Sequence, residues 1–130
     1  MADINLVKQR IRFGDGFCIV ERKEAGETLS LGDTVVLLSD STIVKTRNAT
    51  DGIYGIVVSC ENKSVSGSAG EFFGVAVFGH VVGFTTLTPG ALYYLSAEAG
   101  TIADSGTIAI GYARDAETLF VMPAVADIPY

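Results

Sequence analysis

The chain has 130 residues, which suits a single domain large enough to bury a core of its own. Apolar residues make up 48% of it and charged residues 18%, so it is more apolar and less charged than an average soluble domain. The net charge of −6 argues against nucleic acid as a partner, because phosphates require basic surfaces. The apolar surplus predicts that other subunits cover part of the surface.

The chain begins with a basic segment, residues 1–13, inside an otherwise acidic protein. In an extended strand, Lys8, Arg10 and Arg12 share one face and apolar side chains share the other. Residues 1–13 are then either an ordinary edge strand protected by its charges or an arm that adds a strand to an acidic partner. The residues expected to dock such an arm on its partner are Ile4, Leu6, Lys8, Arg10, Arg12 and Phe13.

Strands are predicted through almost the whole chain, because short runs of Val, Ile, Tyr and Phe alternate with Gly, Asp, Asn and Ser. No stretch keeps a helical period over three turns, and only residues 85–87 suit a turn of helix. This pattern predicts one all-β domain over residues 14–122, a small β-barrel or β-sandwich of β-tulip type with little or no helix. The expected strands are near residues 6–13, 17–22, 34–38, 43–46, 53–59, 71–78, 81–84, 92–95, 107–113 and 118–122.

Residues 29–58 and 87–121 echo each other, with a turn, a strand, a tight turn, a second strand, a loop and a strand that holds a central glycine. The echo predicts two related β units that pack as halves of one core. Four structural glycines are expected to permit this plan. Gly32 and Gly90 would allow sharp reversals, with Pro89 presetting a type II turn, and Gly55 and Gly111 would mark bulges or a close approach of another backbone.

Residues 72–84 are apolar at odd and even positions alike, whereas a strand with one solvated face would alternate. Both faces of this segment are therefore expected to be covered, either as a central pair of core strands or as a strand that lines a subunit interface. The residues assigned to the core or interface are Phe72, Phe73, Val75, Val77, Phe78 and Val81, with Tyr93 and Tyr94 from a later strand.

The last segment, residues 123–130, is apolar and contains two prolines, which exclude a regular helix or a central strand. Its composition is unlike that of a solvated disordered end. We expect an extended tail that lies on its own subunit or, in preference, on a neighbour.

The sequence gives little support for a catalytic site or a metal-binding site. His80 is the single histidine and lies in an apolar strand pattern, where a hydrogen-bonded interior residue is more common than a catalyst. Cys18 and Cys60 lack metal-ligand spacing and are expected to be buried free thiols, with a disulfide between them left open. No phosphate-binding loop, dinucleotide fingerprint or zinc spacing is present, and no apolar run reaches 18 residues. We expect no enzyme activity, no cofactor, no bound metal and no membrane span.

Residues 34–44 (TVVLLSDSTIV), followed by Thr50-Asp51-Gly52 and Gly55-Ile56, resemble the core of lambda-type phage head decoration proteins. In that family an apolar strand and a turn lead to a second strand, a Thr-Asp-Gly loop and a Gly-Ile strand, and residues 72–81 fall where its next strand lies. Residues 87–113 also resemble a phrase common in phage head and tail-fibre proteins. The matches cover most of residues 29–122. The chain departs from the family in its basic, strand-like N-terminal segment and in its repeated C-terminal half.

The resemblance implies a non-enzymatic virion protein, made in the host cytoplasm and located on the capsid surface. Such cement proteins are homotrimers that sit on an expanded shell, clamp neighbouring major capsid subunits and add an N-terminal strand to the capsid protein. A phage tail or tail-fibre module is the alternative, in which Tyr54, Tyr93, Tyr94 and Tyr112 would stack on sugars. A small β-barrel enzyme or ligand-binding protein with a polar pocket around His80 is the third hypothesis.

Overall fold

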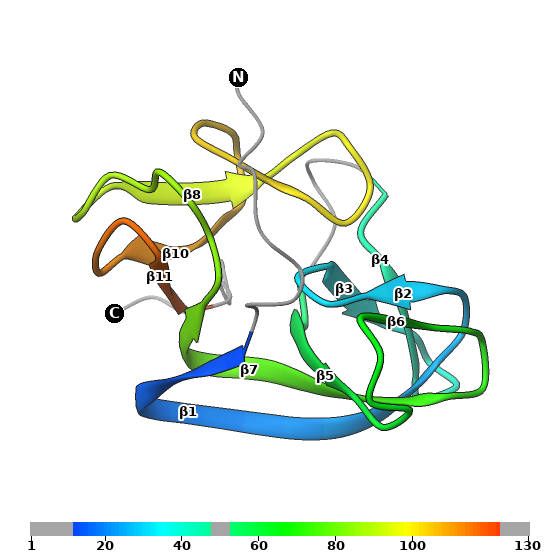
Figure 1. Ribbon diagram of the computed structural model, residues 1–130. Helices are drawn as coiled ribbons and strands as arrows, with labels where there is room; N and C mark the ends of the chain where they lie inside the picture. Colours follow the sequence, from blue (N-terminus) through cyan, green and yellow to red (C-terminus); the bar gives the residue numbers. More distant parts are fainter. Residues whose placement is uncertain (1–11, 48–52, 123–130) are drawn as a thin grey trace.

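A computed structural model describes residues 12–47 and 53–122, and no helix occurs within these ranges (Figure 1). The expected all-β fold is therefore confirmed. The strands are β1 (Arg12–Ala25), β2 (Leu29–Ser30), β3 (Thr34–Leu37), β4 (Thr42–Lys45), β5 (Gly55–Cys60), β6 (Ser66–Gly67), β7 (Phe72–Val82), β8 (Leu92–Leu95), β9 (Ile102–Ala103), β10 (Ala109–Ala113) and β11 (Thr118–Val121).

Five of the described strands form a closed barrel in the order β1, β4, β3, β5 and β7. The barrel closes because β7 also pairs antiparallel with β1, from Arg12 opposite Val82 to Glu24 opposite Phe72. Figure 1 shows these two long strands side by side along the lower edge of the molecule. The prediction of a small barrel is correct.

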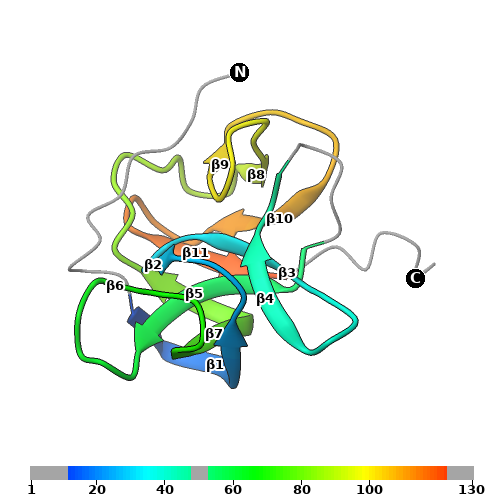
Figure 2. The same ribbon diagram turned by 90° about the vertical axis from the view of Figure 1, so that its right-hand side faces the viewer.

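The strand β7 also begins a second, open sheet. Beyond β7 the strand order continues through β11, β10, β8 and β9, and Phe120 of β11 lies opposite His80 of β7. Figure 2 shows β8, β9 and β10 above the barrel strands. The strand β7 therefore belongs to both parts of the fold, and the barrel and the open sheet join along its edge.

The two echoed segments use the same pairing plan. The strand β3 pairs antiparallel with β4 and with β5, and β8 pairs antiparallel with β9 and with β10. In front of β3 and β8, Gly32 and Gly90 have positive φ angles of 91° and 84°. The Ala91 N–H donates to the Thr88 carbonyl at 3.0 Å, which closes the turn expected at Pro89 and Gly90.

Gly55 and Gly111 lie against the backbone of a neighbouring strand. A Cβ atom at Gly55 would lie 2.4 Å from the Ala76 carbonyl oxygen, and one at Gly111 would lie 2.0 Å from the Phe120 carbonyl oxygen. Both distances are far below a van der Waals contact, so only glycine fits at these positions. The close backbone approach expected from sequence is present at both sites.

One apolar core runs through the barrel and the open sheet. Phe73, Val75 and Val81 are completely buried on the inward face of β7. Tyr93 is buried as well, and its hydroxyl accepts a hydrogen bond from the Thr88 N–H at 2.8 Å. These four residues belong to the core of the chain.

Two strand boundaries and one helical turn were predicted wrongly. From Arg12 on, β1 runs without a break, and a register shift between Phe13 and Cys18 places the expected gap inside the strand as a bulge. The strand β7 likewise joins two expected strands, because Gly79 adopts a φ of 119° that lets the strand continue. No helix forms at residues 85–87, where Thr86 has a φ of 55°.

The two cysteines are free thiols. Cys18 lies opposite Gly79 and Cys60 opposite Phe73, so six positions of β7 separate them. At about 3.3 Å per residue this separation is roughly 20 Å, whereas the Cα atoms of a disulfide lie about 5.5 Å apart. Burial raises the pKa of the Cys18 thiol, which keeps it protonated.

Candidate protein-interaction surface

The expected arm and tail fall mostly outside the described residues, among them Ile4, Leu6, Lys8 and Arg10 of the arm and residues 123–130 of the tail. Arg12 and Phe13 are described and form the first two pairs of β1 with β7, opposite Val82 and Val81. These two residues therefore lie within the barrel sheet and not in front of it.

The residues assigned to the core or interface separate into two sets. Phe73, Val75 and Val81 point inward, whereas Phe72 and Phe78 occupy the outward positions of the same strand. Phe78 is 37% exposed and Phe72 is half-buried, as are Val77 and Tyr94. Within the described residues, the inward face of β7 is therefore covered more completely than its outward face.

The outward positions of five neighbouring strands form one continuous apolar surface, which we call the aromatic face. Strand register joins its members in a row: Ile19 lies opposite Phe78, His80 opposite Phe120, and Phe120 opposite Tyr112, which lies opposite Leu92. Side chains at paired positions project from the same side of a sheet. The face comprises Ile19, Val20, Phe78, His80, Leu92, Tyr112, Phe120 and Met122.

Four rings at the centre of the aromatic face contact one another. The Phe120 ring lies edge-on to Phe78 with 5.3 Å between centroids, and edge-on to His80 at 4.8 Å. The Tyr112 ring stacks on Phe120 at 5.5 Å with an interplanar angle of 19°. Such ring contacts add about 0.5–1.5 kcal/mol per pair beyond simple burial, so the side chains of the face are held in place.

The exposed part of this face is comparable in size to the largest apolar patch of a typical single chain, and such patches are often functional. Six of its residues are exposed by between 37% and 49%. With about 200 Å² for a large apolar residue, they leave roughly 500 Å² of apolar surface in contact with water. A surface of this size on a small protein is typical of a contact site for another protein.

The His80 side chain places a polar ring within this apolar surface. Its Nδ1 is buried and has no hydrogen-bond partner among residues 12–47 and 53–122. Burial lowers the pKa of His80 below its usual value of 6.5, and the nearby charge of Arg114 lowers it further, while Asp115 acts in the opposite direction. The imidazole is therefore neutral at neutral pH and adds no charge to the face.

Charged side chains lie at both ends of the aromatic face. At one end, the Arg22 guanidinium forms an ion pair with Glu61 and lies 3.8 Å from the centroid of the Phe72 ring. At the other end, Arg114 and Asp115 occupy the turn between β10 and β11. An apolar, aromatic centre with a charged rim is the usual composition of a protein–protein interface.

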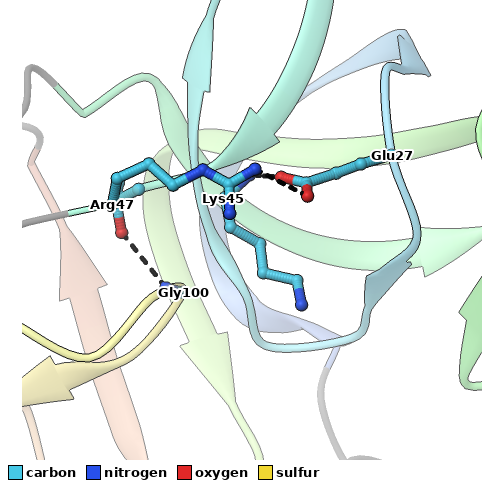
Figure 3. Close-up of polar contacts among 5 residues, drawn as sticks. Glu27, Lys45, Arg47 and Gly100 are labelled. Atoms are coloured by element: carbon cyan, nitrogen blue, oxygen red, sulfur yellow. Dashed lines mark hydrogen bonds and ion pairs between the residues drawn. The ribbon is translucent and has the colours of Figure 1, made fainter.

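A polar cluster lies where the end of β4 meets the loop between β8 and β9, and it has a structural role (Figure 3). The Glu27 carboxylate accepts hydrogen bonds from the Lys45 N–H at 2.8 Å and from the Arg47 guanidinium at 2.7 Å. Behind it, the Gly100 N–H donates to the Thr46 carbonyl at 3.1 Å and thereby fixes the β8–β9 loop to the end of β4. The Gly100 contact therefore holds the open sheet against the barrel, and the Glu27 contacts fix the end of β4 where it does so.

The four tyrosines considered for sugar stacking do not form one surface. Tyr93 is buried, and Tyr54 donates its hydroxyl to Glu21, with burial and that carboxylate together raising its pKa. Tyr94 is half-buried, and Tyr112 stacks within the aromatic face. These four tyrosines together therefore do not line one stacking surface in the part of the chain that the structure describes.

The described residues contain no group of three or more His, Cys, Asp or Glu side chains placed to hold a metal ion. No helix long and apolar enough to cross a membrane is found in residues 12–47 and 53–122. No protein-family model matches the chain, and no curated protein matches it significantly in sequence. Function is therefore inferred from the aromatic face itself.

The sequence identified one member of the aromatic face, Phe78, as a core or interface residue and missed its neighbours. Phe120, Tyr112 and Leu92 each lie at apolar positions of predicted strands, but their proximity to Phe78 depends on the strand order. The signal available in the sequence was the set of apolar side chains at both faces of neighbouring strands. Strand order was needed to assemble them into one surface.

Proposed function

We propose that the protein is a phage capsid decoration, or cement, protein that binds the outside of the head as a homotrimer and stabilises contacts between major capsid subunits. The observation that carries this proposal is the aromatic face, roughly 500 Å² of exposed apolar surface that spans the barrel and the open sheet. The resemblance to lambda-type decoration proteins supports the same assignment. The protein then has a structural role in the virion and no enzymatic one.

The closed barrel suits a protein that must withstand mechanical force in the capsid shell. Its strands are paired around the ring, so it resists shear better than an open sheet with free edges. The aromatic face begins on the longest paired strands, β1 and β7, continues over β11, β10 and β8, and its rings contact one another. A partner that covers this face therefore meets a preorganised surface and loses little conformational entropy on binding.

The N-terminal segment provides the proposed link to the shell. Residues 1–11 precede β1 and carry Lys8 and Arg10, which suit an acidic capsid surface. In a trimer, three such arms act together, so three weak contacts hold firmly through effective concentration. The aromatic face then serves the association of subunits, and the arm serves the attachment to the major capsid protein.

Deletion of residues 2–10 tests the role of the arm. Because β1 is described from Arg12 onward, the shortened chain is expected to keep the barrel and the oligomeric state of the full chain. It is expected to lose binding to expanded heads of the phage that encodes it. A variant with Lys8 and Arg10 changed to Glu is the matched control for the charge contribution. Decoration of heads by the shortened chain at the level of the full chain would contradict the arm's role.

Copy number separates the capsid proposal from the tail or tail-fibre alternative. A cement protein is present in hundreds of copies per virion, whereas a tail part is present in a few to a few dozen. Quantitative mass spectrometry of purified virions, with the major capsid protein as internal reference, measures this ratio. A ratio near one chain per capsid subunit supports the cement role, and a ratio typical of tail proteins would exclude it.

A further inference from the structure

We infer that residues 123–130 of one copy, which we call the tail, dock on the aromatic face of the next copy. Each subunit of a ring then gives one tail and receives one. This inference rests on the proposed homotrimer and deepens it by naming the segment that covers the face. The tail itself lies outside the described residues, so its place follows from where the chain leaves β11 and from its amino acids.

The chain leaves β11 within the aromatic face. Val121, the last residue of β11, lies opposite Gly79 of β7. The next position along both strands brings Met122 beside Phe78. Met122 is 42% exposed, and its N–H donates to the Ile110 carbonyl at 2.8 Å, so its position is fixed by the sheet. The tail therefore starts at the edge of an exposed apolar surface.

The chain can continue from Met122 only on the outer side of the barrel. Both β5 and β11 pair with the edge of β7 that faces away from β1, β5 at residues 73–76 and β11 at residues 79–82. The strand β5 therefore occupies the place straight ahead of β11, and the inner side is filled by the buried core. Pro123 has no N–H with which to extend the sheet. The chain leaves the sheet outward, on the side of the aromatic face.

The first tail residues favour a path away from their own copy. A residue before proline is restricted to extended backbone, so Met122 keeps the direction of β11. None of residues 124–126 is Gly, Asn or Asp, the residues that most often permit a tight reversal. A segment that keeps its direction moves away from Tyr112 and Leu92, which lie behind Met122 in the strand register. It therefore reaches these positions on a neighbouring copy.

The length of the tail matches the width of the face. The aromatic face crosses five strands, which at about 4.8 Å between neighbours span about 19 Å. The eight residues of the tail, extended at about 3.3 Å each, span about 26 Å. The difference of about 7 Å leaves about two residues for the step from one copy to the next.

The amino acids of the tail match the apolar character of the face. Seven of its eight residues are apolar, and Asp127 is its one charged residue. At about 150–200 Å² for each large apolar side chain, Val125, Ile128 and Tyr130 offer roughly 500 Å², which equals the exposed apolar area of the face. Extended segments that contain proline dock on surfaces lined by aromatic rings, because proline loses little entropy on binding. The four contacting rings of the face form such a surface.

The contact is heterologous, because the tail of one copy meets a different surface of the next copy. Heterologous contacts close into rings, and the proposed trimer requires a ring of three. Exchange of one segment between identical copies is a low-cost route to an oligomer. The two ends of the chain then have separate roles, with the tail joining subunits and the N-terminal arm joining the shell.

Removal of the tail tests the contact. A chain that ends at Met122 keeps every strand pairing of the described residues, so we expect it to fold. Leu92→Glu places a charge at the most exposed position of the aromatic face, which is 49% exposed. Native mass spectrometry, at a concentration where the wild type is a trimer, is expected to show both proteins as monomers. The expected mass is about 13.6 kDa for Leu92→Glu and lower for the shortened chain.

Matched controls and second variants separate docking from folding. Ala69→Glu adds the same charge at an exposed position in the turn before β7, and Asp127→Glu keeps the charge of the tail, so both are expected to be trimers. Ile128→Glu alters the tail in the full chain, and Ile19→Glu alters the face at a position that is 44% exposed. Both are expected to be monomers. Circular dichroism identifies any variant that does not fold, and its second variant then replaces it.

A mixture of two variants gives the decisive result. The shortened chain keeps its face, and Leu92→Glu keeps its tail, so an equimolar mixture has one intact contact. The mixture is expected to form a dimer with one copy of each chain. The two chains differ in length by eight residues, so native mass spectrometry resolves this dimer from either chain paired with itself.

Four outcomes would overturn the inference. If the shortened chain stays trimeric, the copies associate elsewhere, and the proposed decoration function stands. If the tail variants dissociate while both face variants stay trimeric, the tail docks on another surface. If each variant is monomeric but the mixture forms no dimer, the tail acts within its own copy. If the wild type itself is monomeric at every concentration, the tail contact and the proposed trimer fail together.

Discussion

The two faces of β7 carry similar amino acids and have different environments. Inward, Phe73, Val75 and Val81 are completely buried in the core. Outward, Phe78 is 37% exposed and lies among rings that contact one another. The inward face stabilises the fold, whereas the outward face is available for assembly. Apolar residues on both sides of one strand therefore indicate two separate tasks, and mutations on the two sides should have different consequences.

The largest contrast is expected between Phe73→Ala and Phe78→Ala. Phe73 is fully buried, so its truncation leaves a cavity and should lower the free energy of unfolding by about 3–5 kcal/mol. Phe78 is partly exposed in the monomer and keeps one side in water, so the same truncation should cost less, about 2 kcal/mol, under monomeric conditions. Urea denaturation of both variants, at a concentration low enough to keep them monomeric, measures the difference. Equal losses would remove the distinction between the faces.

Backbone packing inside the open sheet gives the next effect. At Gly111 an added Cβ would lie 2.0 Å from the Phe120 carbonyl oxygen, so Gly111→Ala should cost about 3 kcal/mol through forced separation of β10 and β11. Gly70→Ala is the matched control, because Gly70 has a positive φ of 90° and open space around it. The control should cost only about 1 kcal/mol. A Gly111→Ala variant as stable as the control would refute the close approach of the two strands.

A smaller effect is expected where the open sheet meets the barrel. The Thr34 and Thr46 hydroxyls, both completely buried, lie 2.7 Å apart in a hydrogen bond. Thr46→Val leaves the Thr34 hydroxyl buried without this partner and should cost about 1–3 kcal/mol. Hydrogen exchange should show faster exchange of the Gly100 N–H, because the substitution removes its hydrogen bond to the Thr46 hydroxyl at 3.3 Å and leaves the one to the Thr46 carbonyl. Unchanged protection at Gly100 would show that the loop is held by other contacts.

The smallest effect concerns pH and His80. Because burial lowers the pKa of His80 in the folded chain, the unfolded chain binds the proton more readily as the pH falls below about 6.5. The stability that neutral His80 contributes is therefore complete above about pH 6.5 and is lost progressively at lower pH. His80→Phe removes this loss, so its stability advantage over the wild type should grow between about pH 7.5 and pH 5.5. Curves of stability against pH that stay parallel for the two proteins would contradict the lowered pKa of His80.

The sequence predicted the class of fold well because strand signals are local. Residues 92–95 were predicted as a strand and form β8, and the paired glycines Gly55 and Gly111 were correctly linked to close backbone approach. Gly79 was taken to end a strand that in fact continues through it. A glycine signals an unusual backbone position, but its local sequence does not distinguish a turn from a bulge.

The candidate surface was harder to predict because it depends on strand order. Phe78, Tyr112 and Phe120 are far apart in the sequence and meet through the pairing of β7 with β11 and of β11 with β10. Periodicity can identify outward positions in each strand separately, but the neighbour of each strand is set by packing of the whole core. The expected arm residues Ile4, Leu6, Lys8 and Arg10 lie outside the described residues, so their role stays a prediction.

The native mass of the wild-type chain in solution tests the central claim most directly. The account predicts that the aromatic face is covered by another copy, so sedimentation equilibrium at micromolar concentration should give about 41 kDa, three times the 13.6 kDa chain. A mass of 13.6 kDa that persists at the highest concentration reached would show that water covers this face in the free protein. That result would contradict the account.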